Sequence, residues 1–147
     1  MRRFQFRLES VLGWRRVELE LEEGRLEALF TERRRWEADT AEIEVRRGES
    51  EKLIDAQTLE GQELVAMIHH RRYLERETAR IAAARADCEK RIAAQRQRVL
   101  EAERKVRLLE RLKERRLAEW TFEANRELEA LAAETFLSKW VREKSQN

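Results

Sequence analysis

Two histidines, one cysteine and many carboxylates are the residues of this chain that could do chemistry. His69 and His70 are the only histidines. Adjacent positions on a helix point about 100° apart, so these side chains cannot share one metal ion as histidines four residues apart do. We interpret them as ordinary, partly exposed helix residues, with pH-dependent contact to a partner as the alternative. The sequence predicts no metal site and no cofactor.

The other patterns that carry catalysis are missing from the sequence. It holds no glycine-rich phosphate loop, no Gly-x-Ser-x-Gly turn and no cysteine and histidine spacing suited to zinc. Cys88 falls on an apolar helical stripe, which favours a small buried hydrophobic side chain over a reactive thiol. Carboxylates are plentiful, but a single pair of helices offers no concave pocket that could desolvate two of them and shift their pKa values. We therefore expect no enzymatic activity.

A run of basic residues is the strongest charge signal in the chain. Between Arg104 and Arg116 stand seven basic and two acidic residues. Arg107, Arg111 and Arg115 follow one another at intervals of four, so like charges stack along one helix face at a small cost. Two interpretations are open: a solvated face that pairs with acids of the first half, or a docking surface for an acidic protein partner. Nucleic acid or an anionic membrane ranks below both, because the net charge is only +2.

Four tryptophans are many for such a chain. Trp36 and Trp120 fall on the predicted helical stripes, where we expect them to fill the core. Trp14 and Trp140 lie near the chain ends, where coiled-coil packing is thinnest and where aromatic side chains often anchor a partner. Core filling and partner anchoring are both open for this second pair.

The composition indicates long helices as the elements that position these residues. The chain has 147 residues, 42% of them charged, with four glycines and no proline. So few turn-forming residues exclude a sandwich, a barrel or a multi-strand sheet. Abundant Ala, Glu, Leu, Lys and Arg are typical of a coiled coil. The chain has a single cysteine and no apolar stretch of the roughly 20 residues that span a bilayer. Charges from Arg7 onward interrupt any signal sequence. These features favour a cytoplasmic protein.

Apolar residues recur at alternating steps of three and four in two stretches. The first stretch starts at Leu8 and ends at Ile54, and the second, which is the more regular, runs from Leu64 to Trp120. A sustained period near 3.5 predicts a left-handed coiled coil. Between the stretches, Gly48 and Gly61 bracket a region of poor helix propensity. The sequence therefore predicts a reversal there.

We predict an all-α fold, a long antiparallel two-helix coiled-coil hairpin that forms a single domain over residues 1–147. Helix one covers about 4–54, the reversal about 48–63, helix two about 64–140, and a polar tail 141–147. The second helix then extends beyond the first. That overhang carries large apolar residues, which soluble monomers seldom leave without a partner. They are Trp120, Phe122, Leu128, Leu131, Phe136, Leu137 and Trp140.

The opening of the chain, Phe4-Gln5-Phe6-Arg7-Leu8-Glu9-Ser10-Val11-Leu12, resembles the start of the FliJ family, the coiled-coil components of the bacterial flagellar type III export apparatus. The segment from Leu108 to Trp120 is similar to the family's basic segment, in which a hydrophobic pair leads into alternating Leu, Glu and Lys or Arg. The Tyr73-Leu74 pair, with Ile81 one heptad later, resembles the start of its second helix. The family's length and two-helix layout match essentially the whole chain.

The resemblance implies a stalk-like adaptor in motility and chemotaxis by flagella. FliJ proteins associate with the hexameric export ATPase FliI, bind the export gate protein FlhA and recycle export chaperones, so they act at the cytoplasmic face of the inner membrane. Carried over to this chain, the ATPase contact falls on Arg2, Arg3, Arg7, Arg107, Arg111, Lys113, Arg115 and Arg116. The gate contact falls on Met67, Tyr73 and Leu74, and Trp14 and Trp140 remain possible partner anchors.

Two other functions compete with the export adaptor. A generic scaffold would form a parallel coiled-coil homodimer, but such a dimer has no use for a break in the helix near residues 48–61. A nucleic-acid-binding basic helix ranks last, because its basic block lies far from the end of a zipper, unlike the forked geometry of basic-zipper proteins. We therefore expect no nucleic acid among the partners.

Overall fold

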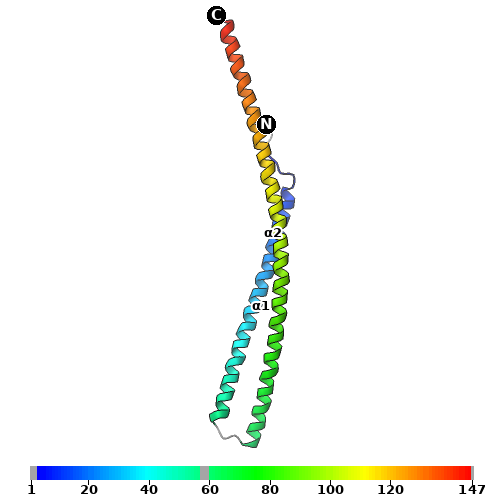
Figure 1. The fold of residues 1–147 in the computed structure, drawn as a ribbon, viewed down its shortest axis with the longest axis vertical. Helices are drawn as coiled ribbons and strands as arrows, with labels where there is room; N and C mark the ends of the chain where they lie inside the picture. Colours follow the sequence, from blue (N-terminus) through cyan, green and yellow to red (C-terminus); the bar gives the residue numbers. More distant parts are fainter. Residues whose placement is uncertain (1–2, 57–59, 147) are drawn as a thin grey trace. The chain divides into compact units, whose positions relative to one another are not determined.

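The computed structural model describes residues 3–56 and 60–146. These residues form two long α-helices, α1 (Glu9–Ala56) and α2 (Gly61–Ser145), and no strand (Figure 1). The two helices pack against each other as an all-α antiparallel hairpin, which confirms the predicted fold class. Contacts divide the chain into two compact units, Met1–Glu18 with Ala102–Asn147, and Leu19–Glu101.

The apolar seam of the Leu19–Glu101 unit follows the predicted spacing. Leu74 and Ile81 of α2 pack against Ile43 of α1, and Trp36 covers this cluster from the side. Every buried residue of α2 within this unit lies on the alternating steps of three and four counted from Leu64. They are Leu74, Ile81, Cys88, Ile92, Gln95 and Val99. The seam is one row of side chains wide, which is what a stripe with this period allows.

Polar side chains on the seam help to set which residues of the two helices lie opposite each other. Gln95 is buried, and its amide donates to the backbone oxygen of Glu22 at 3.0 Å and also to the Glu22 carboxylate. The Cys88 thiol donates to the backbone oxygen of Leu29 at 3.6 Å. A shift of one helix along the other would leave these buried groups without partners, so they favour a single register.

An ion pair beside the seam joins the helices in the same antiparallel order. Both terminal nitrogens of Arg91 donate to the carboxylate of Glu32, at 2.5 and 3.1 Å, and the indole N–H of Trp36 donates to it at 3.3 Å. These hydrogen bonds, from Arg91 first and Trp36 second, lower the pKa of Glu32. A carboxylate whose pKa is lower in the folded chain stabilises the fold above its unfolded pKa, and this contribution is lost as the pH falls through the folded value.

Glu32→Gln tests this linkage. We expect the variant to melt about 1–3 °C lower than the wild type at pH 7, with the difference shrinking as the pH falls through the lowered pKa of Glu32 and the wild-type carboxylate becomes protonated. Thermal melts followed by circular dichroism at a series of pH values measure it. Glu37→Gln is the matched control, because Glu37 is exposed on the same helix and the described residues give it no ion pair. An equal pH dependence of both variants would contradict the assignment.

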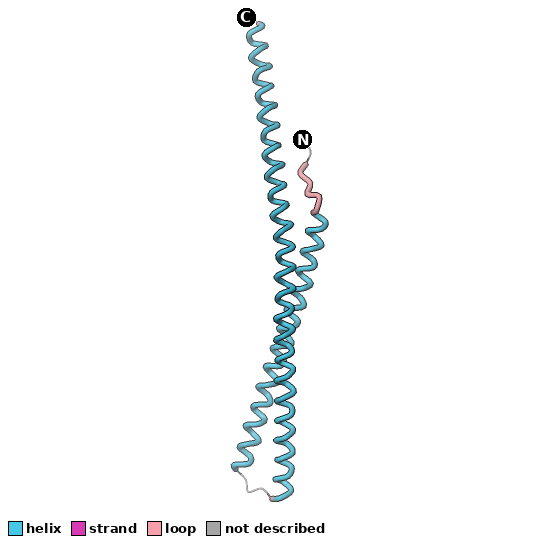
Figure 2. Tube along the Cα trace, turned by 45° about the vertical axis from the view of Figure 1, so that its right-hand side comes forward, coloured by secondary structure: helices cyan, strands magenta, loops and turns pink. Residues whose placement is uncertain are grey.

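Helix α1 begins five residues later than predicted. Residues 3–8 are not helical, and Glu9 donates its N–H to the backbone oxygen of Phe6 at 3.1 Å as the helix starts (Figure 2). A carboxylate in the first helical turn interacts favourably with the helix dipole, which suits Glu9 to this position.

The reversal is narrower than the predicted range of 48–63. Helix α1 continues through Gly48 to Ala56, and Gly48 has no positive φ, so it is an ordinary helical residue. Helix α2 starts at Gly61, and residues 57–59 lie outside the described residues. At the start of α2, the Glu63 carboxylate accepts from the Glu60 N–H at 3.4 Å, and Leu64 N–H donates to the Glu60 backbone oxygen at 3.0 Å. Glu60 and Glu63 therefore cap α2 as half of a capping box.

Helix α2 also runs further than predicted, and most of the expected polar tail is helical. The helix ends at Ser145 rather than near residue 140. Basic residues in its last turn, Arg142 and Lys144, interact favourably with the negative end of the helix dipole. The Ser145 hydroxyl donates to the backbone oxygen of Arg142 at 3.0 Å. These interactions extend the helix where composition alone predicted its end.

Candidate functional site

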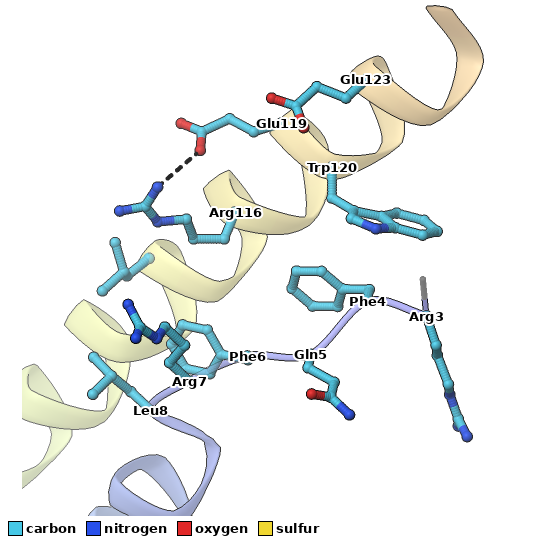
Figure 3. Close-up of a pocket in the computed structure, with 11 residues that line it drawn as sticks. Arg3, Phe4, Gln5, Phe6, Arg7, Leu8, Arg116, Glu119, Trp120 and Glu123 are labelled. Atoms are coloured by element: carbon cyan, nitrogen blue, oxygen red, sulfur yellow. Dashed lines mark hydrogen bonds and ion pairs between the residues drawn. The ribbon is translucent and has the colours of Figure 1, made fainter. Parts of the chain in front are cut away.

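The N-terminal strap, residues 3–8, lies along α2 within one compact unit. The Phe4 ring packs against Trp120, with ring centroids 6.0 Å apart and planes tilted by 57°. Phe6 is also half-buried (Figure 3). The strap and α2 enclose a groove of about 760 Å³ with an apolar floor and charged rims. Its rims carry Arg3, Arg7, Arg116, Glu119 and Glu123.

The alternation of apolar and polar residues explains why this segment is extended. Side chains two residues apart lie on the same side of an extended chain, whereas on a helix they would be about 200° apart. Phe4 and Phe6 can therefore both contact α2 only if the segment between them is extended. The prediction that these residues are the start of helix one is wrong. The alternation in Phe-Gln-Phe-Arg indicates an extended segment.

The basic segment of α2, Arg104–Arg116, is partly neutralised by nearby acids. Lys113 reaches Glu9 of α1 at 2.8 Å, which is the cross-helix pairing considered in the sequence analysis. Within α2, Arg107 pairs with Glu103 at 3.2 Å and Arg116 with Glu119 at 3.3 Å. The segment also contributes an acid, Glu110, to Arg16 of α1 at 3.2 Å. All of these pairs are largely exposed, so each adds little to stability.

Arg111 and Arg115, like Arg104 and Lys105, are basic residues of this segment that form no ion pair among the described residues. Arg111 and Arg115 are exposed, and with Leu108 and Leu112 they line a shallow depression. Among the described residues, no acidic side chain lies within ion-pair distance of either guanidinium. A pair of unneutralised guanidinium groups beside exposed leucine is suited to carboxylate recognition.

The strap adds further positive charge to the same unit. Arg3 and Arg7 are exposed and line the groove in front of Phe4 and Phe6. Arg2, which was assigned to the same contact, lies outside the described residues. The structure thus brings Arg3 and Arg7 into one unit with Arg107, Arg111, Lys113, Arg115 and Arg116.

The three residues assigned to the gate contact differ in exposure. Tyr73 is exposed, and its ring stacks on His70 with centroids 6.5 Å apart. Met67 is half-buried. Leu74 is 2% exposed and packs on Ile43 and Ile81. Because a partner cannot touch Leu74 without opening the seam, Tyr73 and Met67 are the two of these residues that can form a surface contact.

The two tryptophans near the chain ends are both exposed, in contrast to Trp36 and Trp120. The Arg15 guanidinium lies 4.8 Å from the ring of Trp14, and the Lys144 ammonium lies 4.2 Å from that of Trp140. Trp140 belongs to the last part of α2, where every described residue from Asn125 to Gln146 is exposed. The predicted overhang with large exposed apolar residues is thus confirmed, except that Trp120 is half-buried under Phe4.

Cys88, His69 and His70 lie in ordinary structural surroundings. Burial raises the pKa of the Cys88 thiol, which therefore stays protonated at neutral pH. His69 and His70 are both exposed. Within residues 3–56 and 60–146, no group of three or more His, Cys, Asp and Glu is arranged to hold a metal ion. In the same ranges, neither helix has an apolar stretch of the length needed to cross a bilayer. What the site offers is charge and apolar surface for binding.

The fold defines the class as an all-α antiparallel helical hairpin. Comparison with protein-family models, with curated proteins and with solved structures gives no match to the chain. The resemblance of its two segments therefore enters the functional argument only as part of a proposal.

Proposed function

We propose that the chain is a non-enzymatic component of a flagellar protein export apparatus, a stalk-like adaptor of the FliJ kind. One observation carries the proposal. The two segments that resemble the family, Phe4–Leu12 and Leu108–Trp120, stand about a hundred residues apart in sequence. In the structure they pack together through the Phe4–Trp120 contact and the Lys113–Glu9 ion pair. The contact between these two segments supports a single binding surface.

In this proposal the export ATPase hexamer FliI binds that surface through acidic groups. Arg3 and Arg7 of the strap, with Arg111 and Arg115 of α2, supply exposed positive charge. Lys113, Arg107 and Arg116 can exchange their weak intramolecular pairs for carboxylates of the partner, since exposed ion pairs contribute little. Complementary charge then sets the orientation and the association rate more than the final affinity.

The export gate FlhA is the second proposed partner, at the start of α2. Tyr73 and Met67 present an aromatic and a thioether side chain near the basic pair Arg71 and Arg72. Aromatic and methionine side chains are enriched in protein interfaces, which supports this assignment. Export chaperones are proposed as further partners on the strength of the resemblance alone. The chain would then be cytoplasmic and would reach the inner membrane only through the apparatus.

An adaptor of this kind works by coupling and not by chemistry. If the chain binds one nucleotide state of the ATPase better than another, it shifts the ATPase toward that state and is itself bound more tightly in it. No residue of the chain needs to touch ATP. The competing scaffold function requires a parallel homodimer, yet the seam residues of each helix already face the other helix of the same chain.

Titration of the purified export ATPase with the full chain tests this function. We expect a saturable rise in the rate of ATP hydrolysis that weakens as salt is increased, because exposed charge pairs are screened. The chain alone should hydrolyse no ATP. An unchanged hydrolysis rate, together with no co-purification of the chain with the ATPase at low salt, would contradict the proposal.

A further inference from the structure

The C-terminal part of α2 carries a second stripe, apolar in its middle and basic at both ends, that α1 and the strap do not cover. Its members follow alternating steps of four and three, from position 126 to position 144. Ala124, which is buried, lies on the opposite side of the helix, since nine residues at 3.6 per turn rotate Ala133 by about 180° from it. The stripe is called the tail seam here; it consists of Arg126, Ala130, Ala133, Leu137, Trp140 and Lys144.

The tail seam is bordered by further exposed apolar side chains. Phe136 is 69% exposed and Val141 is 58% exposed, while Trp140 remains 48% exposed although Lys144 stacks on its ring. A stripe with this period, widened by flanking apolar residues, is the pattern that pairs one helix with another. An exposed patch of this kind on a protein surface marks an interaction site.

We propose that the tail seam binds a second copy of this chain, with the two α2 ends antiparallel. The first argument is the fit of side-chain sizes. In the antiparallel register that places Arg126 opposite Lys144, the small Ala130 meets the large Trp140, and Ala133 meets Leu137. The two-fold axis repeats each pairing, as an isologous interface requires. Small residues opposite large ones fill the space between helices without voids.

The second argument is the apolar area available. Two aromatic side chains per copy, Phe136 and Trp140, bury roughly 150–250 Å² each when fully covered. The exposed parts of these four rings, with Leu137, Val141 and the flanking charged side chains, can bring the total to about the 1,000 Å² that a specific interface needs. The pairing is therefore expected to be weak and dependent on concentration. It does not depend on the export function, because it uses neither the strap nor the basic segment.

The molar mass of the full chain, measured by size-exclusion chromatography with light scattering over a wide concentration range, tests the pairing. We expect the mass to rise with concentration toward twice the 17.7 kDa of one chain. Trp140→Glu and Leu137→Glu should each weaken the dimer at least tenfold. Phe122→Glu is the matched control: Phe122 is 70% exposed on the same helix, but it precedes the paired segment 126–144, so its variant should dimerise like the wild type.

Cysteine crosslinking tests the direction of the helices. Arg126→Cys and Lys144→Cys variants, when mixed and mildly oxidised, should form a disulfide between the two variants and little within either one alone, since equal positions lie about 27 Å apart in this register. The wild type, with its buried Cys88, reports the background. A wild-type mass of one chain at every concentration, an unchanged dimer in both Glu variants, or crosslinks only between equal positions would overturn the proposal.

Discussion

We expect the double charge reversal Arg111→Glu/Arg115→Glu to abolish stimulation of the export ATPase. The two guanidinium groups are exposed and form no ion pair within the described part of the chain, so the structure gives them no role in stability. In the proposed complex they face carboxylates. Their replacement by glutamates sets like charges against each other, which costs several kcal/mol and weakens binding by far more than about tenfold.

The matched control reverses two other arginines of α2. Arg72 and Arg76 have the same spacing and are also exposed, so Arg72→Glu/Arg76→Glu changes the net charge equally. This control should stimulate the ATPase like the wild type, and circular dichroism should report equal helicity for all three proteins. Stimulation that survives Arg111→Glu/Arg115→Glu would remove these residues from the ATPase contact. Equal loss in both double variants would show that only the net charge of the chain matters.

The largest loss of stability is expected for Leu74→Ala. Leu74 is 2% exposed and belongs to one buried cluster with Ile43 of α1 and Ile81 of α2. Truncation of a buried leucine to alanine costs about 2–5 kcal/mol, because apolar burial is lost and a cavity remains. A seam one row wide lets water or neighbouring side chains reach the space, so we expect about 2–3 kcal/mol, at the lower end of that range. Urea unfolding followed by circular dichroism measures the free energy of unfolding.

Leu21→Ala is the control for the same truncation at an exposed position. Leu21 is 59% exposed within the same compact unit, so its variant should change the free energy of unfolding by less than about 0.5 kcal/mol. If the two variants lost equal stability, Leu74 would not belong to the core. The result also bears on the gate contact, since a core role for Leu74 leaves Tyr73 and Met67 as the surface residues there.

The seam was predictable because its period is a property of the sequence alone. Every buried residue of α2 from Leu74 to Val106 falls on the predicted steps. Element ends were harder, because they depend on tertiary contacts. The strap is extended since Phe4 and Phe6 both pack on α2, and the last turns of α2 form with Lys144 stacked on Trp140. Local propensity predicts neither of these contacts.

The basic residues of the candidate site could be predicted from the sequence, but which of them form ion pairs could not. The basic segment is visible in the sequence, yet which guanidinium groups remain unpaired depends on the register of the two helices. Lys113 finds Glu9, and Glu110 finds Arg16, only in the observed pairing. A shift of α1 along α2 by one heptad would change which acids of α1 lie opposite which bases of α2. That Arg111 and Arg115 form no ion pair is therefore known only once the helices are placed.

The pairing of α1 with α2 of the same chain underlies the strap, the basic site and the gate residues alike. A Leu26→Cys/Ile92→Cys variant in a Cys88→Ala background tests it most directly. Positions 26 and 92 lie between two cross-helix hydrogen bonds, from Gln95 to Glu22 and from Cys88 to Leu29. Under mild oxidation the antiparallel hairpin predicts an intrachain disulfide at a rate independent of protein concentration. Disulfides formed only between chains would contradict it.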